Sequence, residues 1–324
     1  MANEYMQKSL QDENTKQQLI FYGTASLVSL CYVLLTFFAP QTSNAFNLGQ
    51  GQIFFLKFTI AVPYIARWFF AAYGLLALKR YISMAKDEDV AVTKLLRSFQ
   101  NSIYWFIIGT ILIALIGGVK SYFPENTDIL PTYTIVTNYL YVFPSLIGFI
   151  TIYRGVLHLR SSQEMSESKL ASYMFNTLIV LFFSGFYIFL IYTNPSRQFS
   201  SDPANPATYY LPDLIILLTI VIPTFISWWF GFTSAFLLSD TVPHLVRAAS
   251  FKGITKILYG IWSIIFSSII IQSLLSLGSA RLYAVGLGFL LLVIYIFIIF
   301  EVLGYYFIAH GSNDLRKSLN ENNL

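Results

Sequence analysis

The sequence predicts an all-α integral membrane protein with eight transmembrane helices, built as two tandem four-helix units in parallel orientation. Three observations predict this fold class: the composition, the number of long apolar stretches, and a motif that occurs twice. Hydrophobic residues make up 56% of the 324 residues and charged residues only 11%, whereas charged residues form roughly a quarter of a soluble domain. This balance is typical of a chain whose helices face lipid.

Eight apolar stretches are long enough to cross a bilayer, which takes about 20 residues of helix. They cover residues 19–39, 53–78, 101–119, 134–157, 171–193, 211–238, 257–278 and 282–308. Each is expected to be helical, because lipid offers the backbone no hydrogen-bond partner. Pro63, Pro144 and Pro223 fall inside these stretches, and we expect them to kink the helices without ending them.

A repeated motif indicates the two units. The segment TIAVPYIARWFF at residues 59–70 returns 160 residues later as TIVIPTFISWWF at residues 219–230, with five of twelve positions identical. Flanking matches follow in the same order, as a tandem repeat requires: Ser29, Tyr32 and Pro40 with Ser184, Tyr187 and Pro195, and Thr93, Lys94 and Leu96 with Thr255, Lys256 and Leu258. The predicted organisation is a polar tail at 1–18, unit A at 19–160, unit B at 161–310 and a second polar tail at 311–324.

Basic residues predict the orientation of the chain. Of twenty Lys and Arg residues, fifteen fall in the two tails and the even-numbered connections, and four fall on the other side. Because basic residues favour the cytoplasmic face, both tails are expected there. Units of four helices then insert the same way up, unlike the inverted repeats of many transporters. We also expect a short interfacial helix in each of two cytoplasmic connections, 79–100 and 239–256, with a solvated linker as the alternative.

Arg67 is the most demanding residue within the predicted spans. It lies ten residues from Lys57 and twelve from Lys79, hence about 15 to 18 Å along a helix from either boundary. An arginine near the membrane centre costs at least about 2.5 to 3.5 kcal/mol, so it should face protein and meet an oxygen partner. It could be a structural pin between helices, or an anion site or gate. Ser227 takes its place in unit B.

Glu301 is the first candidate partner of Arg67, because it is the only acid well inside an apolar stretch. Its distance from Arg281, twenty residues or about 30 Å of helix, places it nearer the cytoplasmic boundary than Arg67. Gln272 is an alternative hydrogen-bonding residue, as are Asn138 and Asn176.

Two proline and tryptophan pairs recur with the motif. Pro63 and Trp68 in unit A match Pro223 and Trp228 in unit B. We expect them to be helix-kink and packing positions, with the lining of a central cavity as the alternative.

No motif points to catalysis, a metal or a cofactor. Cys31 is the single cysteine, and the three histidines have no neighbours at ligand spacing. Nucleotide-binding loops and hydrolase motifs are absent from the sequence. We therefore expect a multi-pass membrane protein that is not an enzyme and has no cofactor. Its expected partners are the lipid bilayer and other membrane subunits, and no nucleic acid.

Two functions remain open from the sequence. The first is a non-catalytic membrane subunit or scaffold that binds partners or lipids. The second is a channel or transporter for an uncharged or amphipathic small solute, or an anion, with a path between the repeats near Arg67. Ion pathways usually carry several intramembrane charges, so the single deep arginine favours the first function.

Overall fold

The computed structural model describes residues 2–38, 50–85, 90–120, 129–162, 173–174, 176–182, 185, 222–247, 252–276 and 287–322. These residues are almost entirely helical and include no strand. The long helices are α1 (Ala2–Phe37), α2 (Gln50–Met84), α3 (Val90–Lys120), α4 (Ile129–Ser162), α7 (Ile222–Arg247), α8 (Lys252–Ser276) and α10 (Leu287–Asn322). All seven are long and apolar enough to cross a membrane. The chain is therefore an all-α, polytopic membrane protein.

The fifth predicted span, 171–193, lies mostly outside the described residues, and so does the first part of the sixth, 211–238. The total of eight helices therefore stays a prediction. α2 runs without interruption through Pro63, and α4 runs through Pro144. Prolines can be tolerated in this setting because neighbouring groups satisfy the backbone they free.

The expectation of interfacial helices is wrong for the described parts of both connections. α2 continues to Met84 and α3 starts at Val90, while α7 continues to Arg247 and α8 starts at Lys252. The membrane helices themselves extend into the connections. Long basic side chains can keep their charged ends in water while their stems cover apolar surface, so the basic ends of these helices need not break at the membrane boundary.

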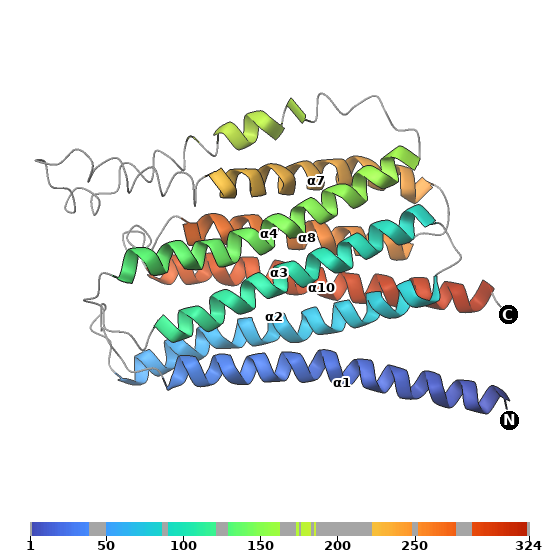
Figure 1. Ribbon diagram of the computed structural model, residues 1–324, viewed down its shortest axis with the longest axis horizontal. Coiled ribbons are helices and arrows are strands. Elements are labelled where there is room, and N and C mark those ends of the chain that lie inside the picture. Colours follow the sequence, from blue (N-terminus) through green and yellow to red (C-terminus); the bar gives the residue numbers. More distant parts are fainter. Residues whose placement is uncertain are drawn as a thin grey trace, which may run out of the picture.

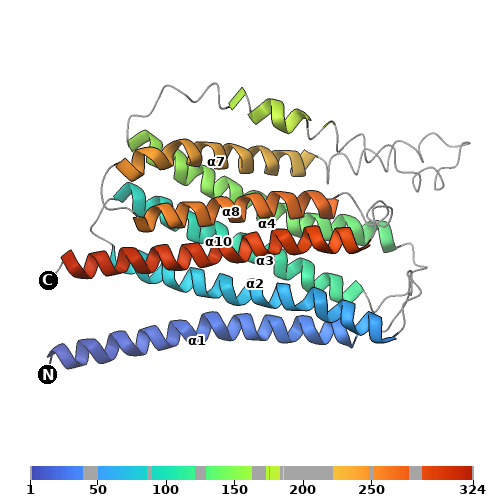
Figure 2. The ribbon, with the colours of Figure 1, turned by 180° about the vertical axis from the view of Figure 1, so that it is seen from behind.

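The helices form one bundle with α1 at its outer edge, and both termini lie at the same end (Figure 1). The view from behind shows the same arrangement (Figure 2). The most extensive packing joins α8 to α10, α3 to α4, α2 to α10 and α4 to α7. Two of these interfaces, α2/α10 and α4/α7, join helices that are far apart in the sequence.

Glycines allow α8 and α10 to approach closely. Gly260 faces Gly304 and Gly253 faces Gly311, each with the backbone of the other helix where a Cβ would lie. The spacing of seven residues repeats the contact two turns later, because side chains seven apart share a helix face. Small residues of this kind let membrane helices pack through their backbones. The α8/α10 pair is thus a rigid support for residues in α10.

α1 is attached to the bundle separately. A large buried cluster joins α2, α3, α4, α7, α8 and α10. A smaller cluster joins α1 to α2 and α3, and its members are Ala25, Tyr32, Ala61, Trp68, Ala72 and Ala114. Four of these six are alanines, and partly buried side chains such as Phe21, Tyr22 and Phe69 complete the contact.

Candidate functional site: a buried ion pair between α2 and α10

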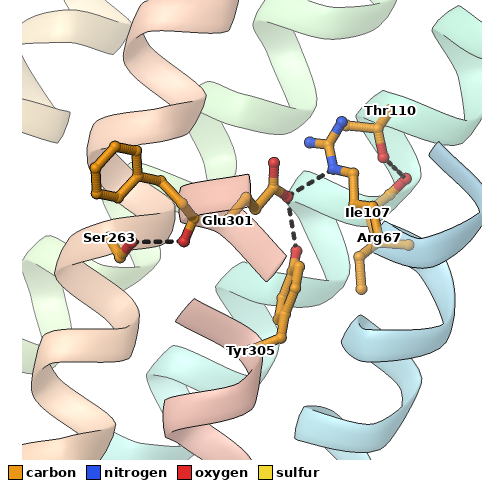
Figure 3. A network of polar contacts seen from close by, with 7 residues as sticks. Arg67, Ile107, Thr110, Ser263, Glu301 and Tyr305 are labelled. Atoms are coloured by element: carbon orange, nitrogen blue, oxygen red, sulfur yellow. Dashed lines mark hydrogen bonds and ion pairs between the residues drawn. The ribbon is translucent and has the colours of Figure 1, made fainter. Parts of the chain in front are cut away.

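Arg67 of α2 and Glu301 of α10 form an ion pair inside the bundle. The Nε of Arg67 donates to Oε1 of Glu301 at 2.7 Å. Arg67 is 2% exposed and Glu301 is fully buried. The hydroxyl of Tyr305, which is also fully buried, donates to the same carboxylate oxygen at 3.0 Å. Figure 3 shows the three side chains converging between the two helices.

Helix geometry explains why these groups meet. Glu301 and Tyr305 are four residues apart on α10, so both point to the same face. Gly74 lies on α2, two turns after Arg67, and a Cβ there would come within 2.9 Å of the Tyr305 carbonyl oxygen. The absence of a side chain at Gly74 lets the two backbones approach. In the same interface, the Tyr295 hydroxyl donates to the Thr59 carbonyl.

The counting argument had placed Glu301 closer to the cytoplasmic boundary than Arg67, yet the two side chains are in contact. α10 is 36 residues long and extends to Asn322. The bilayer core needs only about 20 residues of helix, so the position of Arg281 in the chain does not fix the depth of Glu301. α10 extends far enough beyond Glu301 for it to reach the level of Arg67.

The positive charge of Arg67 and the negative charge of Glu301 neutralise each other. Either charge alone in this position would be strongly unfavourable, because burial removes its hydration. Glu301 Oε1 accepts hydrogen bonds from both the Arg67 guanidinium and the Tyr305 hydroxyl. Its second oxygen, Oε2, is buried and accepts no hydrogen bond from the described residues. The carboxylate therefore depends on Arg67 and Tyr305 for its stabilisation.

Two of the other predicted site residues, Trp68 and Trp228, pack against aromatic rings. Trp68 is buried and packs edge-on against Tyr32, with ring centroids 5.4 Å apart. Trp228 is buried beside Phe225, at 5.8 Å. Gln272 belongs to α8, but its side chain lies outside the described residues.

The predicted prolines and amide side chains form no part of the ion-pair site that the structure describes. Pro63 is buried in α2 and Pro223 is half-buried near the start of α7. Asn176 is fully buried, and its amide finds no hydrogen-bond partner among the described residues. The side chain of Asn138 lies outside the described part of the chain.

Two further interhelical ion pairs were missed by sequence reasoning. Arg160 of α4 contacts Asp240 of α7 at 2.5 Å, and Lys256 of α8 contacts Asp314 of α10 at 2.6 Å. In the sequence analysis Arg160 counted only toward the orientation of the chain, and Lys256 counted toward the orientation and the repeat. Tyr305 was also missed, although its spacing of four residues from Glu301 could have identified it.

The described residues contain no group of three or more His, Cys, Asp or Glu side chains that could hold a metal ion. Comparisons with models of protein families, with curated proteins and with solved structures gave no match.

Proposed function

We propose that this chain is a non-catalytic membrane scaffold whose two halves are pinned together by Arg67 and Glu301. The observation that carries the proposal is that the deep arginine is buried against an acid from the other half of the chain, at 2.7 Å. A cavity of about 330 Å³ lies between α1, α2 and α3, and neither Arg67 nor Glu301 lines it. The arrangement favours a structural pin over a charge that faces a solute path.

The packing pattern supports two tandem units within this scaffold. Suppose that α2 matches α7, α3 matches α8 and α4 matches α10. Replacing each helix by its match then turns the α2/α10 interface into the α7/α4 interface. It likewise turns α3/α4 into α8/α10 and α2/α3 into α7/α8. All six contacts occur. Two units inserted the same way up, around an axis along the membrane normal, would produce this pattern.

The sequences of α4 and α10 add support at an offset of 156 residues. The identical pairs include Gly148 and Gly304, Ile152 and Ile308, Gly155 and Gly311, Leu159 and Leu315, and Arg160 and Arg316. At the same offset, Ser145 matches Glu301, and the motif already matched Ser227 with Arg67. Both serines are buried. On this alignment, unit B carries a serine at the place of Arg67, and unit A carries one at the place of Glu301.

The outer surface of the bundle fits a protein that binds lipids or other membrane subunits. Large apolar side chains are exposed along several helices, including Phe55 at 70%, Leu178 at 64% and Tyr259 at 61%. Such side chains are stable against lipid or against partner helices. Eight helices with both tails in the cytoplasm complete the proposal, and the common end of the two termini accords with an even number of crossings.

The alternative is a channel or transporter for an anion or for an uncharged or amphipathic solute near Arg67. One observation favours it. Glu301 Oε2 is buried without a hydrogen-bond partner among the described residues. A buried polar atom of this kind can mark a functional site.

Reconstituted vesicles separate the two functions. Wild-type protein and the Arg67→Ser/Glu301→Ser double variant would be placed in vesicles loaded with a chloride-sensitive dye, or with a fluorescent neutral solute. The scaffold predicts no flux above that of empty vesicles from either protein. Flux through the wild type that disappears in a folded double variant would overturn the scaffold and establish a path at Arg67.

A further inference from the structure

The cavity between α1, α2 and α3 is apolar along most of its length and basic at one end. Its walls include Val28 of α1, Ala72 of α2 and Ile107 of α3, and Trp68 closes the deep end. Ile20, at the opposite end, is 57% exposed. The cavity therefore opens at the end where α1 begins. Ala25 of α1 and Ala72 of α2 line the cavity, and their small side chains leave this volume unfilled.

Lys79 lies at the open end of the cavity. Its Nζ sits 5.6 Å from the centroid of the Phe21 ring, within the range of a cation–π contact. Phe21 in turn stacks with Tyr104, at 6.4 Å between ring centroids. Among the described residues, no acid forms an ion pair with Lys79. An ammonium held at the mouth of an apolar cavity complements a ligand with an anionic head and an aliphatic chain.

The length of the cavity matches one leaflet of a bilayer. Lys79 and Trp68 are eleven residues apart on α2, or about 16 Å along the helix axis. The hydrocarbon core of a bilayer is about 30 Å thick, so one leaflet contributes about half of that. Lys79 therefore lies at headgroup level when Trp68 lies near the midplane. Arg80 follows Lys79 directly and adds a second positive charge at this level.

We propose that this cavity binds one acyl chain of an anionic phospholipid, with the headgroup phosphate beside Lys79. The lipid comes from the leaflet at the N-terminal end of α1, which the distribution of basic residues assigns to the cytoplasm. It fills the gap that the alanines leave between α1 and the bundle. The site adds a ligand to the proposed scaffold and does not depend on the Arg67–Glu301 pair, so each can fail without the other.

The other half of the chain provides a natural comparison. At the offset of 160 residues set by the motif, Phe232 takes the place of Ala72 and Ser239 takes the place of Lys79. Unit B thus has a bulky ring where unit A has space, and no charge where unit A has a cation. Ala72→Phe is the substitution that should fill the cavity, and it introduces the residue found in unit B.

Native mass spectrometry of the full chain in mild detergent tests the site. Wild type, Lys79→Met, Ala72→Phe and the control Lys94→Met would each be titrated with phosphatidylglycerol and with phosphatidylcholine of the same chains. Lys94 is exposed and does not line the cavity. We expect wild type and Lys94→Met to prefer phosphatidylglycerol about fivefold, Lys79→Met to lose that preference, and Ala72→Phe to bind little of either lipid.

Several results would overturn the proposal. Equal binding of the two lipids by wild type, or an unchanged preference in Lys79→Met, would remove the headgroup assignment. Full binding by Ala72→Phe would place the lipid outside the cavity. If Ala72→Phe does not fold, Val28→Trp fills the cavity from the α1 side and replaces it. Saturation of the site by palmitate but not by phosphatidylglycerol would identify a free fatty acid, and a protein dimer as the bound species would identify a second copy.

Discussion

The α2/α10 and α4/α7 interfaces place their ion pairs at different depths. In α2/α10 the pair lies in the bundle interior, with Arg67 2% exposed and Glu301 fully buried. In α4/α7 the pair of Arg160 and Asp240 lies near the C-terminal ends of both helices, with the Arg160 side chain 1% exposed and the Asp240 side chain 41% exposed. A buried pair fixes how two helices are oriented, because losing one partner leaves a buried charge unpaired. At the second pair water can reach the acid, although the arginine is buried.

The two interfaces also differ in the residues near the middle of their helices. Tyr305 donates to Glu301 in α2/α10, whereas α4 has Phe149 at the position that the proposed repeat matches with it, 156 residues earlier. Gly74 faces the Tyr305 backbone, and the proposed repeat matches it with Ser234 of α7. The Ser234 hydroxyl donates to the Phe230 carbonyl of its own helix at 2.6 Å and lies 3.5 Å from the Phe149 carbonyl. The same helix arrangement therefore accommodates either a charged or a neutral centre. Tyr305 donates a hydrogen bond to the charged Glu301, whereas Phe149 has no hydroxyl to donate to Ser145.

The largest expected effect comes from breaking the buried pair on one side. Arg67→Ser introduces the residue that the proposed repeat matches with Arg67 and leaves Glu301 unpaired, so we expect a loss of about 3 to 5 kcal/mol in the free energy of unfolding. Ser145→Ala is the matched control at the neutral centre, because the Ser145 hydroxyl is buried without a hydrogen-bond partner among the described residues. Thermal unfolding in detergent measures both. Equal losses in the two variants would remove the distinction between the interfaces.

A smaller effect is expected from closing the gap at Gly74. Gly74→Ala places a methyl group 2.9 Å from the Tyr305 carbonyl oxygen, and such overpacking costs about 1 to 3 kcal/mol. Gly23 of α1 has nothing within 4 Å of a Cβ, so Gly23→Ala should be neutral or slightly stabilising. The difference in unfolding temperature between the two glycine variants is the measurement. No difference would mean that α2 and α10 are not in backbone contact.

Removal of the Tyr305 hydroxyl should have an effect of similar size to that of Gly74→Ala. Tyr305→Phe gives α10 the residue that α4 has, and it deletes one hydrogen bond to a charged group, for a loss of about 1.5 to 3 kcal/mol at most. The loss should vanish when Glu301 is already serine, since the acceptor is then gone. Comparing the Tyr305→Phe effect in both backgrounds by thermal unfolding tests this dependence. An equal loss in both would show that the hydroxyl does not act through Glu301.

The smallest effect is expected at the pair of Arg160 and Asp240. Asp240→Asn should cost about 1 kcal/mol, because the amide oxygen can still accept a hydrogen bond from the buried Arg160 and water reaches residue 240. The loss should shrink further in high salt, whereas the loss in Arg67→Ser should not, since buried pairs are screened much less. Unfolding at two salt concentrations makes the comparison. A large, salt-independent loss in Asp240→Asn would place both pairs in the same class.

The sequence predicted the membrane class and favoured Glu301 as the partner of Arg67 for one physical reason. Lipid permits few charges, so each deep charge needs a partner, and the candidates were few. It could not predict the depth of Glu301, because α10 continues to Asn322, beyond the apolar stretch that ends at residue 308. The pair of Arg160 and Asp240 escaped because charges near helix ends can also be satisfied by water.

The central claim is that Arg67 and Glu301 stabilise the bundle as a pair, and a double-mutant cycle tests it most directly. Unfolding free energies would be measured for wild type, Arg67→Ser, Glu301→Ser and the double variant, which carries the serines of the other interface. We predict that the double variant recovers about 1 to 3 kcal/mol relative to the sum of the single losses. Strictly additive losses would contradict direct pairing, and an unchanged stability of Arg67→Ser would show that this arginine is not buried.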